Sequence, residues 1–225
     1  GALRPFPLFS QRIEDWSGRF PPRSRDKPLR SFRCGHFPPG IGTPLSASYL
    51  INKLDHNNIR VLREAVTGLV KIRASLADTE KMKISDALFR IAGIASWNLA
   101  AHQSAKQYML EPVLTEALNE ELTENYDLIF GLLSIAYDPT AIYHIRKNIE
   151  NGTSESIGFA IELMDLFLDP NIKTYLFPLL DDTGIYEKIN RLQSEFPVEL
   201  NEPVRLLLNI INRDCNQIMT FTKLC

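Results

Sequence analysis

From Ser46 to its end, the chain repeats apolar residues at the spacing of amphipathic α-helices. About ten such segments follow one another between short polar breaks, and no alternating apolar–polar pattern typical of strands competes with them. Residues 45–225 are also numerous enough to form one domain with its own hydrophobic core. We therefore predict an all-α fold for this part of the chain.

The first 44 residues have a different composition, because they hold eight of the fourteen prolines. Each proline fixes φ and lacks a backbone N–H, so neither a long helix nor a central strand fits between them. This segment carries a net charge of +5, whereas the remaining residues sum to −7. We expect residues 1–44 to be disordered or extended. The alternatives are a basic arm that contacts a membrane surface or nucleic acid, and a segment that is foreign to the native domain.

The three cysteines are odd in number and share no short spacing, which favours a reducing compartment over a disulfide framework. No uncharged apolar run approaches the roughly 18 residues of a membrane span. The N-terminus also lacks the apolar central region of a signal peptide. We expect a cytoplasmic protein. Because the chain lacks an initiator methionine and stops abruptly at Cys225, we expect it to be part of a longer polypeptide, truncated at its C-terminus.

Two Asp-Pro pairs predict helix starts. In Asp138-Pro139 and in Asp169-Pro170, the carboxylate is expected at the N-cap, where it would accept free N–H groups of the first turn. The proline would take the first helical position, where its missing N–H costs nothing. Other expected caps are Asn57 or Asn58 and Asn201, and Asn151-Gly152 is expected to end a helix.

The two Asp-Pro pairs are 31 residues apart, and the sequence around them repeats. Laying residues 132–149 over residues 163–180 pairs apolar positions on both sides of the turn. Within the second copy, Leu166 and Leu176 are expected in the core, so that an aspartate at either position would bury an unpaired charge.

An earlier copy of the same pattern spans residues 50–72. There Asp55 precedes Arg60 at a short distance, much as Asp169 precedes Lys173. The common pattern is a first helix, a turn of the form D-x-x-I/V-R/K and a second helix that ends in L-x-x-L. It resembles HEAT repeats of the armadillo type, over about 180 residues, and these repeats form α-solenoids. The resemblance implies a right-handed superhelix of stacked helix pairs. Its structural repeat turns would contain Asp55, Arg60, Asp138, Pro139, Asp169, Pro170 and Lys173.

Residues 126–182, together with INRDCNQIMTFTKLC at the end of the chain, have a narrower resemblance. They look like the soluble helical-repeat region attached to bacterial transporters of the major-facilitator or ATP/ADP-carrier type. This implies a cytoplasmic accessory region, tethered at the inner membrane through a transporter part that the chain lacks. Cys215 and Phe221 depart from the resemblance, because an aromatic residue and a tryptophan are expected there.

The residue types used in catalysis do not form a recognisable motif. None of the four histidines has a partner at metal-ligand spacing, and His102 is interpreted as a half-buried structural residue. The pairs Glu120-Glu121 and Asp181-Asp182 resemble acid/base couples, but capping of a helix end explains the second pair. Cys215 and Cys225 are interpreted as small core residues. No phosphate-binding loop or nucleophile elbow is present in the sequence. We predict no catalytic residue, metal or cofactor.

Basic residues cluster between residues 50 and 90, and acidic residues between residues 111 and 127. A HEAT-like nucleic-acid enzyme of the DNA glycosylase type, or a lyase-type repeat protein, is the alternative hypothesis. Solvated repeat faces explain the same charges, and nucleic acid is not the expected partner. The sequence therefore predicts a non-catalytic interaction or scaffold module. Its partner would be another protein, including a membrane protein, or an adjacent domain of the same polypeptide.

Overall fold

The structure is a computed structural model that describes residues 44–72 and 78–225. These residues form ten helices and no strand, which confirms the all-α prediction. Residues 1–43 of the expected disordered segment lie outside the described residues, and Pro44 is the first residue of a helix. The helices are α2 (Pro44–Asn52), α3 (Ile59–Ile72), α4 (Asp78–Gln107), α5 (Pro112–Ala136), α6 (Pro139–Asn151), α7 (Ser154–Asp165), α8 (Pro170–Leu180), α9 (Ile185–Leu192), α10 (Pro203–Asn212) and α11 (Thr220–Leu224).

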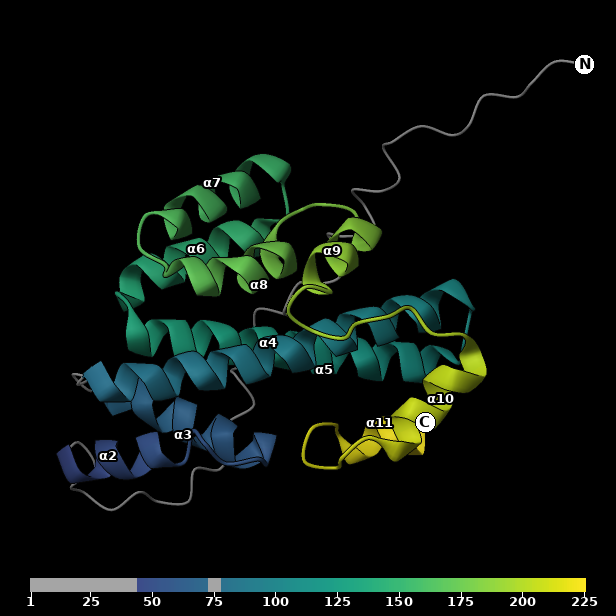
Figure 1. Cartoon of the computed structure of the whole chain (residues 1–225), viewed down its shortest axis with the longest axis horizontal. Helices are drawn as coiled ribbons and strands as arrows, with labels where there is room; N and C mark the ends of the chain where they lie inside the picture. The colour runs from purple at the N-terminus through teal and green to yellow at the C-terminus, as the bar shows by residue number, and fades with distance from the viewer. Residues whose placement is uncertain (1–43, 73–77) are drawn as a thin grey trace, which may run out of the picture.

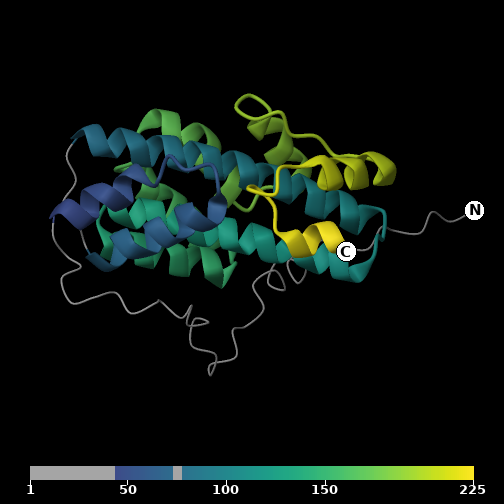
Figure 2. The ribbon, with the colours of Figure 1, turned by 90° about the horizontal axis from the view of Figure 1, so that it is seen from below.

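A long antiparallel hairpin of α4 and α5 forms the middle layer of the molecule (Figure 1). On one side of it lie α6 to α9, with α6 against α5 and with α8 and α9 against α4. On the other side, α2 and α3 cover one end of the hairpin and α10 and α11 cover the opposite end (Figure 2). Every other described helix except α7 thus packs directly against the central hairpin.

The position of α4 between two layers explains its small side chains. Ala87, Ala92 and Ala95 are completely buried, and a methyl side chain lets neighbouring helices approach closely. Helix α5 buries apolar residues along its whole length, from Leu114 to Leu133, for the same reason. These two helices, with 30 and 25 residues, are the longest of the described helices.

The buried apolar residues form two clusters. The larger one fills the space between α2, α3, α4, α5, α6, α7, α8 and α9. The smaller one lies where the far end of the hairpin meets the C-terminal helices, with Leu118 of α5 against Leu206 and Ile210 of α10. The C-terminal end of the molecule therefore has its own small core.

Helix boundaries confirm some of the predicted caps and correct others. Asp138 accepts hydrogen bonds from Thr140 N and Ala141 N, at 3.2 and 3.1 Å, and α6 ends at Gly152 in the left-handed conformation. Asn58 caps α3 as expected, because its Oδ1 accepts from Arg60 N at 2.9 Å.

Two predicted caps are wrong in detail. Asp169 occupies the N-cap position of α8, but its carboxylate accepts no N–H of that helix. The N-cap of α10 is Glu202 and not Asn201. Asn201 is buried instead, and its backbone N–H donates to Ser104 Oγ at 3.0 Å, which ties the start of this segment to α4.

The paired repeat positions do not all share one environment. Leu176 is completely buried in α8, as predicted, and its counterpart Ile145 is completely buried in α6. Leu166 is 81% exposed, so its assignment to the core is wrong. The reason is local: α7 ends at Asp165, and Leu166 lies in the turn that follows, where the helical period no longer applies. Among the described helices, none combines the length and the apolar character needed to cross a membrane.

Candidate interaction surface

The two Asp-Pro turns lie against each other. The rings of Tyr137, which precedes Asp138, and Phe167 are 5.0 Å apart between centroids. The Tyr137 phenol also lies beside Asp169, and its pKa is raised, first by burial and second by that carboxylate. Asp169 is thus directed at the neighbouring turn and not at its own helix.

The remaining predicted turn residues make separate contacts. Lys173 Nζ binds Asp165, at 2.8 Å to Oδ1 and 2.7 Å to the backbone carbonyl, so it joins the start of α8 to the end of α7. Asp55 forms an ion pair with Lys83 of α4 at 3.4 Å, and Arg60 is exposed in the first turn of α3. Because the α2–α3 turn and the Asp-Pro turns lie on opposite sides of the hairpin, the seven residues form no single site (Figure 1).

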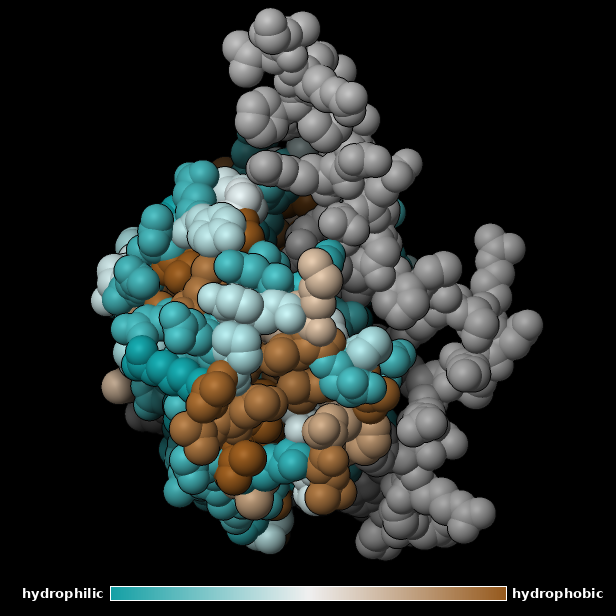
Figure 3. Space-filling view, turned by 90° about the vertical axis from the view of Figure 1, so that its right-hand side faces the viewer, coloured by the Kyte–Doolittle hydropathy of each residue, from teal (hydrophilic) through white to brown (hydrophobic). Residues whose placement is uncertain are grey.

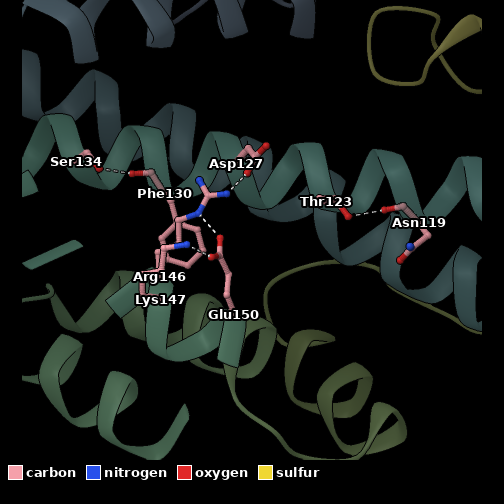
Figure 4. A network of polar contacts seen from close by, with 8 residues as sticks. All are labelled: Asn119, Thr123, Asp127, Phe130, Ser134, Arg146, Lys147 and Glu150. Carbon is pink, nitrogen blue, oxygen red and sulfur yellow. Dashed lines mark hydrogen bonds and ion pairs between the residues drawn. The ribbon is translucent and has the colours of Figure 1, made fainter. Parts of the chain in front are cut away.

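A charged network joins α5 to α6 near the same turns (Figure 4). Arg146 binds Asp127 at 2.5 Å and Glu150 at 2.7 Å, and its guanidinium carbon lies 5.7 Å from the centre of the Phe130 ring. Burial tends to raise the pKa of Glu150, but hydrogen bonds from Lys147 and Arg146 outweigh it, and the pKa is lowered. All four charges have partners, so this network holds two helices together and leaves no group for a ligand.

Helix α10 carries apolar residues on two faces. Leu206 and Ile210 point into the small C-terminal core and are almost fully buried. Four others lie on the solvent side, with exposed fractions between 41% for Leu207 and 71% for Val204. They follow the helical spacing i, i+3, i+4 and i+7, so they line one face of the helix. These exposed residues are Val204, Leu207, Leu208 and Ile211.

The short helix α11 adds two large exposed residues, Phe221 and Leu224, at 55% and 80%. Figure 3 shows hydrophobic side chains gathered on the lower half of this face, at the end of the molecule where α10 and α11 lie. We call the six residues Val204, Leu207, Leu208, Ile211, Phe221 and Leu224 the C-terminal apolar surface. Contiguous apolar surface of this kind marks interaction sites on soluble proteins.

A buried carboxylate anchors α11 to the hairpin. Glu121 of α5 is 4% exposed, and it accepts from Met219 N at 2.9 Å and from the Thr222 hydroxyl. Asn98 of α4 donates to the other oxygen at 3.5 Å. Burial raises the pKa of Glu121, whereas the hydrogen bonds from Thr222 and Met219 and the charge of Arg213 act in the opposite direction. The anchor therefore depends on a desolvated group with specific partners.

The end of α10 is held in the same way. Lys223 of α11 donates to the carbonyl oxygens of Ile211, at 3.0 Å, and of Arg213. A cation at the C-terminus of a helix satisfies its free carbonyl groups and complements the helix dipole. The C-terminal apolar surface is consequently presented on a fixed framework, which reduces the entropy that binding would cost.

The structure also places the other candidate groups. Glu120 is exposed while Glu121 is buried, so these neighbours do not act as a couple. Asp181 accepts from Thr183 N at 3.3 Å, which confirms its capping role. Cys215 and Cys225 are exposed, and the core assignment for them is wrong because both lie in polar or terminal turns.

His102 is more deeply buried than expected, at 7% exposed. No group of three or more potential metal ligands occurs among residues 44–72 and 78–225. A search of family models, curated proteins and solved structures found no match to the chain.

Sequence reasoning missed the C-terminal apolar surface, although PVRLLLNII contains a signal for it. Six of these nine residues are aliphatic, and at helical spacing they cover a wide arc that a single packing contact does not fill, beside a polar face with Arg205 and Asn209. Only one apolar side of α10 is covered by the residues that the structure describes. The other apolar side stays exposed in the described part of the chain.

Proposed function

We propose that the protein is a non-catalytic interaction module whose C-terminal apolar surface binds another protein. The observation that carries this proposal is the exposed apolar stripe of α10. It runs from Val204 to Ile211, and Ile211 is 61% exposed. Isolated surface leucines need no explanation, but four aliphatic side chains on one face of one helix are a contiguous hydrophobic patch. Burying them would release the water that they order.

The occupant is a helix of the partner. Residues at i, i+3, i+4 and i+7 present the ridge that packs against a second amphipathic helix, and their span of seven residues corresponds to about 10 Å of helix. Phe221 and Leu224 of α11 flank this ridge and widen the area that a partner helix contacts. The same mode of recognition, an amphipathic helix laid on an apolar surface, recurs among protein–protein complexes.

The partner class follows from the resemblances in the sequence. A HEAT-type α-solenoid of a transporter-associated region would bind the membrane part or an adjacent domain of the same polypeptide. Support for the repeat comes from the contacts within the two helix pairs that the Asp-Pro turns join, α5–α6 and α7–α8, and from the contact between the two turns. We accordingly place the partner helix in a cytoplasmic segment of a membrane protein or in an adjoining domain.

The proposal can be tested by crosslinking within cells that express the whole natural protein. The photoreactive residue p-benzoylphenylalanine replaces Leu208 in one strain and Met82 in another. Met82 is the matched control, because it is 70% exposed on α4, away from the C-terminal apolar surface. We expect one defined adduct from position 208, formed with a helical segment that mass spectrometry can locate, and none from position 82.

The partner segment is then synthesised and titrated into the purified protein by isothermal calorimetry. The proposal requires that Ile211→Glu weakens binding at least tenfold, because it places a charge in an apolar contact. It also requires that Met82→Glu leaves the affinity within a factor of two. Equal adducts from both positions, or equal affinities of both variants, would overturn the proposal.

A further inference from the structure

A cleft of about 460 Å³ lies between the α2–α3 turn, the middle of α4, residues 196–198 and the connection from α10 to α11. Its size falls within the range of small-molecule sites, about 300–1,000 Å³. The floor is apolar, with Ile91 and Ile94 of α4, and Phe196 forms part of one wall. None of these residues belongs to the C-terminal apolar surface, so the cleft is a second and separate feature.

Two arginines line the cleft. Arg213 follows α10, and Arg90 comes from α4. Neither forms an ion pair within 4.0 Å with a carboxylate of the described residues. Arg90 instead donates to the backbone carbonyls of Leu54 and His56, which are neutral. Asp214 is the acidic residue of the lining, so the cleft carries more positive than negative charge.

Arg213 and Trp97 form the most distinctive part of the lining. The guanidinium carbon lies 3.8 Å from the centre of the Trp97 ring, a cation–π contact between residues 116 positions apart. Nε of Arg213 is buried and has no hydrogen-bond partner in the described part of the chain. Burial lowers the pKa of Arg213 to about 10, the charge of Glu121 acts in the opposite direction, and the side chain stays charged at neutral pH. A partly desolvated charge with an unmade hydrogen bond is costly, and an anion in the cleft would offset part of that cost.

The walls of the cleft are held in place before any ligand binds. Ile59 N donates to Asn216 O at 3.0 Å, and Asn58 Nδ2 donates to Asn216 Oδ1 at 2.9 Å, which joins the two rims. On the other side, Gly93 lets Phe196 approach α4, because a Cβ at this position would lie 3.1 Å from the Phe196 ring. The cleft is thus a preorganised space and not a gap between independent segments.

We propose that this cleft binds a small aromatic acid, with its ring on the apolar floor beside Trp97 and its anionic group at Arg213 and Arg90. The planar guanidinium groups suit a carboxylate, which can accept two parallel N–H donors from one arginine. The apolar floor and the Phe196 wall suit a flat ring in the same way. The assignment does not depend on the partner proposed for α10.

The test uses 2-naphthoate as the probe and 2-naphthalenemethanol as its uncharged counterpart, titrated by isothermal calorimetry. A Trp16→Phe background leaves Trp97 as the single tryptophan, so that its fluorescence reports binding at the cleft itself. We expect saturable binding of 2-naphthoate, with a change in Trp97 emission, and at least tenfold weaker binding of the alcohol.

Arg213→Gln is expected to weaken 2-naphthoate binding at least tenfold. The matched control is Arg205→Gln, which removes an exposed arginine of α10 that pairs with Glu199 and should change the affinity less than twofold. Arg90→Gln provides a second test if Arg213→Gln lowers the melting temperature strongly. Binding that persists in both cleft variants, binding that is lost in Leu208→Glu, or no binding at millimolar probe would each overturn the proposal.

Discussion

The region around the two Asp-Pro turns and the C-terminal end of the molecule differ in how their apolar helix residues are covered. Around the turns, Leu176 of α8 and Ile145 of α6 are both completely buried, and the exposed hydrophobic residues lie on three different elements, namely Tyr143 on α6, Phe159 on α7 and Leu166 in the second turn. At the C-terminal end, α10 covers a small core with Leu206 but leaves Leu208 on the opposite face 53% exposed. The first region thus exposes single hydrophobic residues, whereas the second has a whole apolar helix face that the described residues do not cover.

The kind of polar contact differs along with the packing. Near the turns, charged residues form partly exposed ion pairs such as Arg146–Asp127, which contribute little individually. At the C-terminal end, buried Glu121 and the cation Lys223 bind backbone and hydroxyl groups and fix the position of α11. A helix with few apolar contacts of its own is thus positioned by specific hydrogen bonds. The C-terminal end therefore holds an exposed apolar face in a fixed position, whereas the two turns pack against each other.

The largest expected effect tests whether Leu176, in the second repeat copy, is a core residue. Leu176→Asp should lower the free energy of unfolding by roughly 3–5 kcal/mol, because it buries an unpaired charge. Leu166→Asp is the matched variant, ten positions earlier in the same copy and 81% exposed, and should cost less than about 0.5 kcal/mol. Urea denaturation of both variants measures the difference. Equal losses would contradict the distinction between core and turn.

The next effect concerns the anchor of α11. Glu121→Ala removes the acceptor for Met219 N and the Thr222 hydroxyl and should cost about 1–3 kcal/mol. Amide hydrogen exchange at Met219 should accelerate more than exchange at Ile142, which lies in α6 and is far from the change. Unchanged exchange at Met219 would show that α11 is held by other contacts.

The pH dependence of stability tests the same carboxylate. Burial raises the pKa of Glu121, so the folded protein binds this proton more tightly than the unfolded chain does. The resulting stabilisation is fully present below the unfolded pKa, near 4.5, and is lost as the pH rises through the folded pKa. The unfolding free energy of Glu121→Gln, relative to wild type, should therefore increase from pH 4.5 upward. Glu120→Gln, at the exposed neighbouring position, should show no such trend.

A smaller effect separates the two Asp-Pro turns. Asp138→Ala removes a side chain that accepts two N–H groups of α6 and should cost about 1 kcal/mol. Asp169→Ala should cost less as a cap, because this carboxylate accepts no N–H of α8. It should, however, lower the pKa of Tyr137, since the neighbouring negative charge is gone. Thermal melts and a spectroscopic titration of the tyrosines measure the two effects.

Much of this architecture could be predicted from local sequence. The all-α class follows from the helical period, and the start of α6 at Pro139 and its end at Gly152 follow from residue chemistry. The exposure of Leu166 could not be predicted, because the repeat alignment continues through a turn where the helix has already ended.

The missed features depend on contacts between distant residues. Glu121 meets Thr222 across 101 positions, and Trp97 meets Arg213 across 116. Neither pair leaves a local period or a spacing motif in the sequence. The uncovered face of α10 had a local signal, but only the fold shows which of its two apolar faces is buried.

The affinity of the protein for its crosslinked partner helix, compared between wild type and Ile211→Glu, tests the central claim most directly. Ile211 is 61% exposed, so the variant should keep the wild-type melting temperature within about 2 °C while its affinity falls at least tenfold. That result would show that the C-terminal apolar surface serves binding and not folding. An unchanged affinity would contradict the account, and so would a large loss of stability that leaves the affinity unchanged.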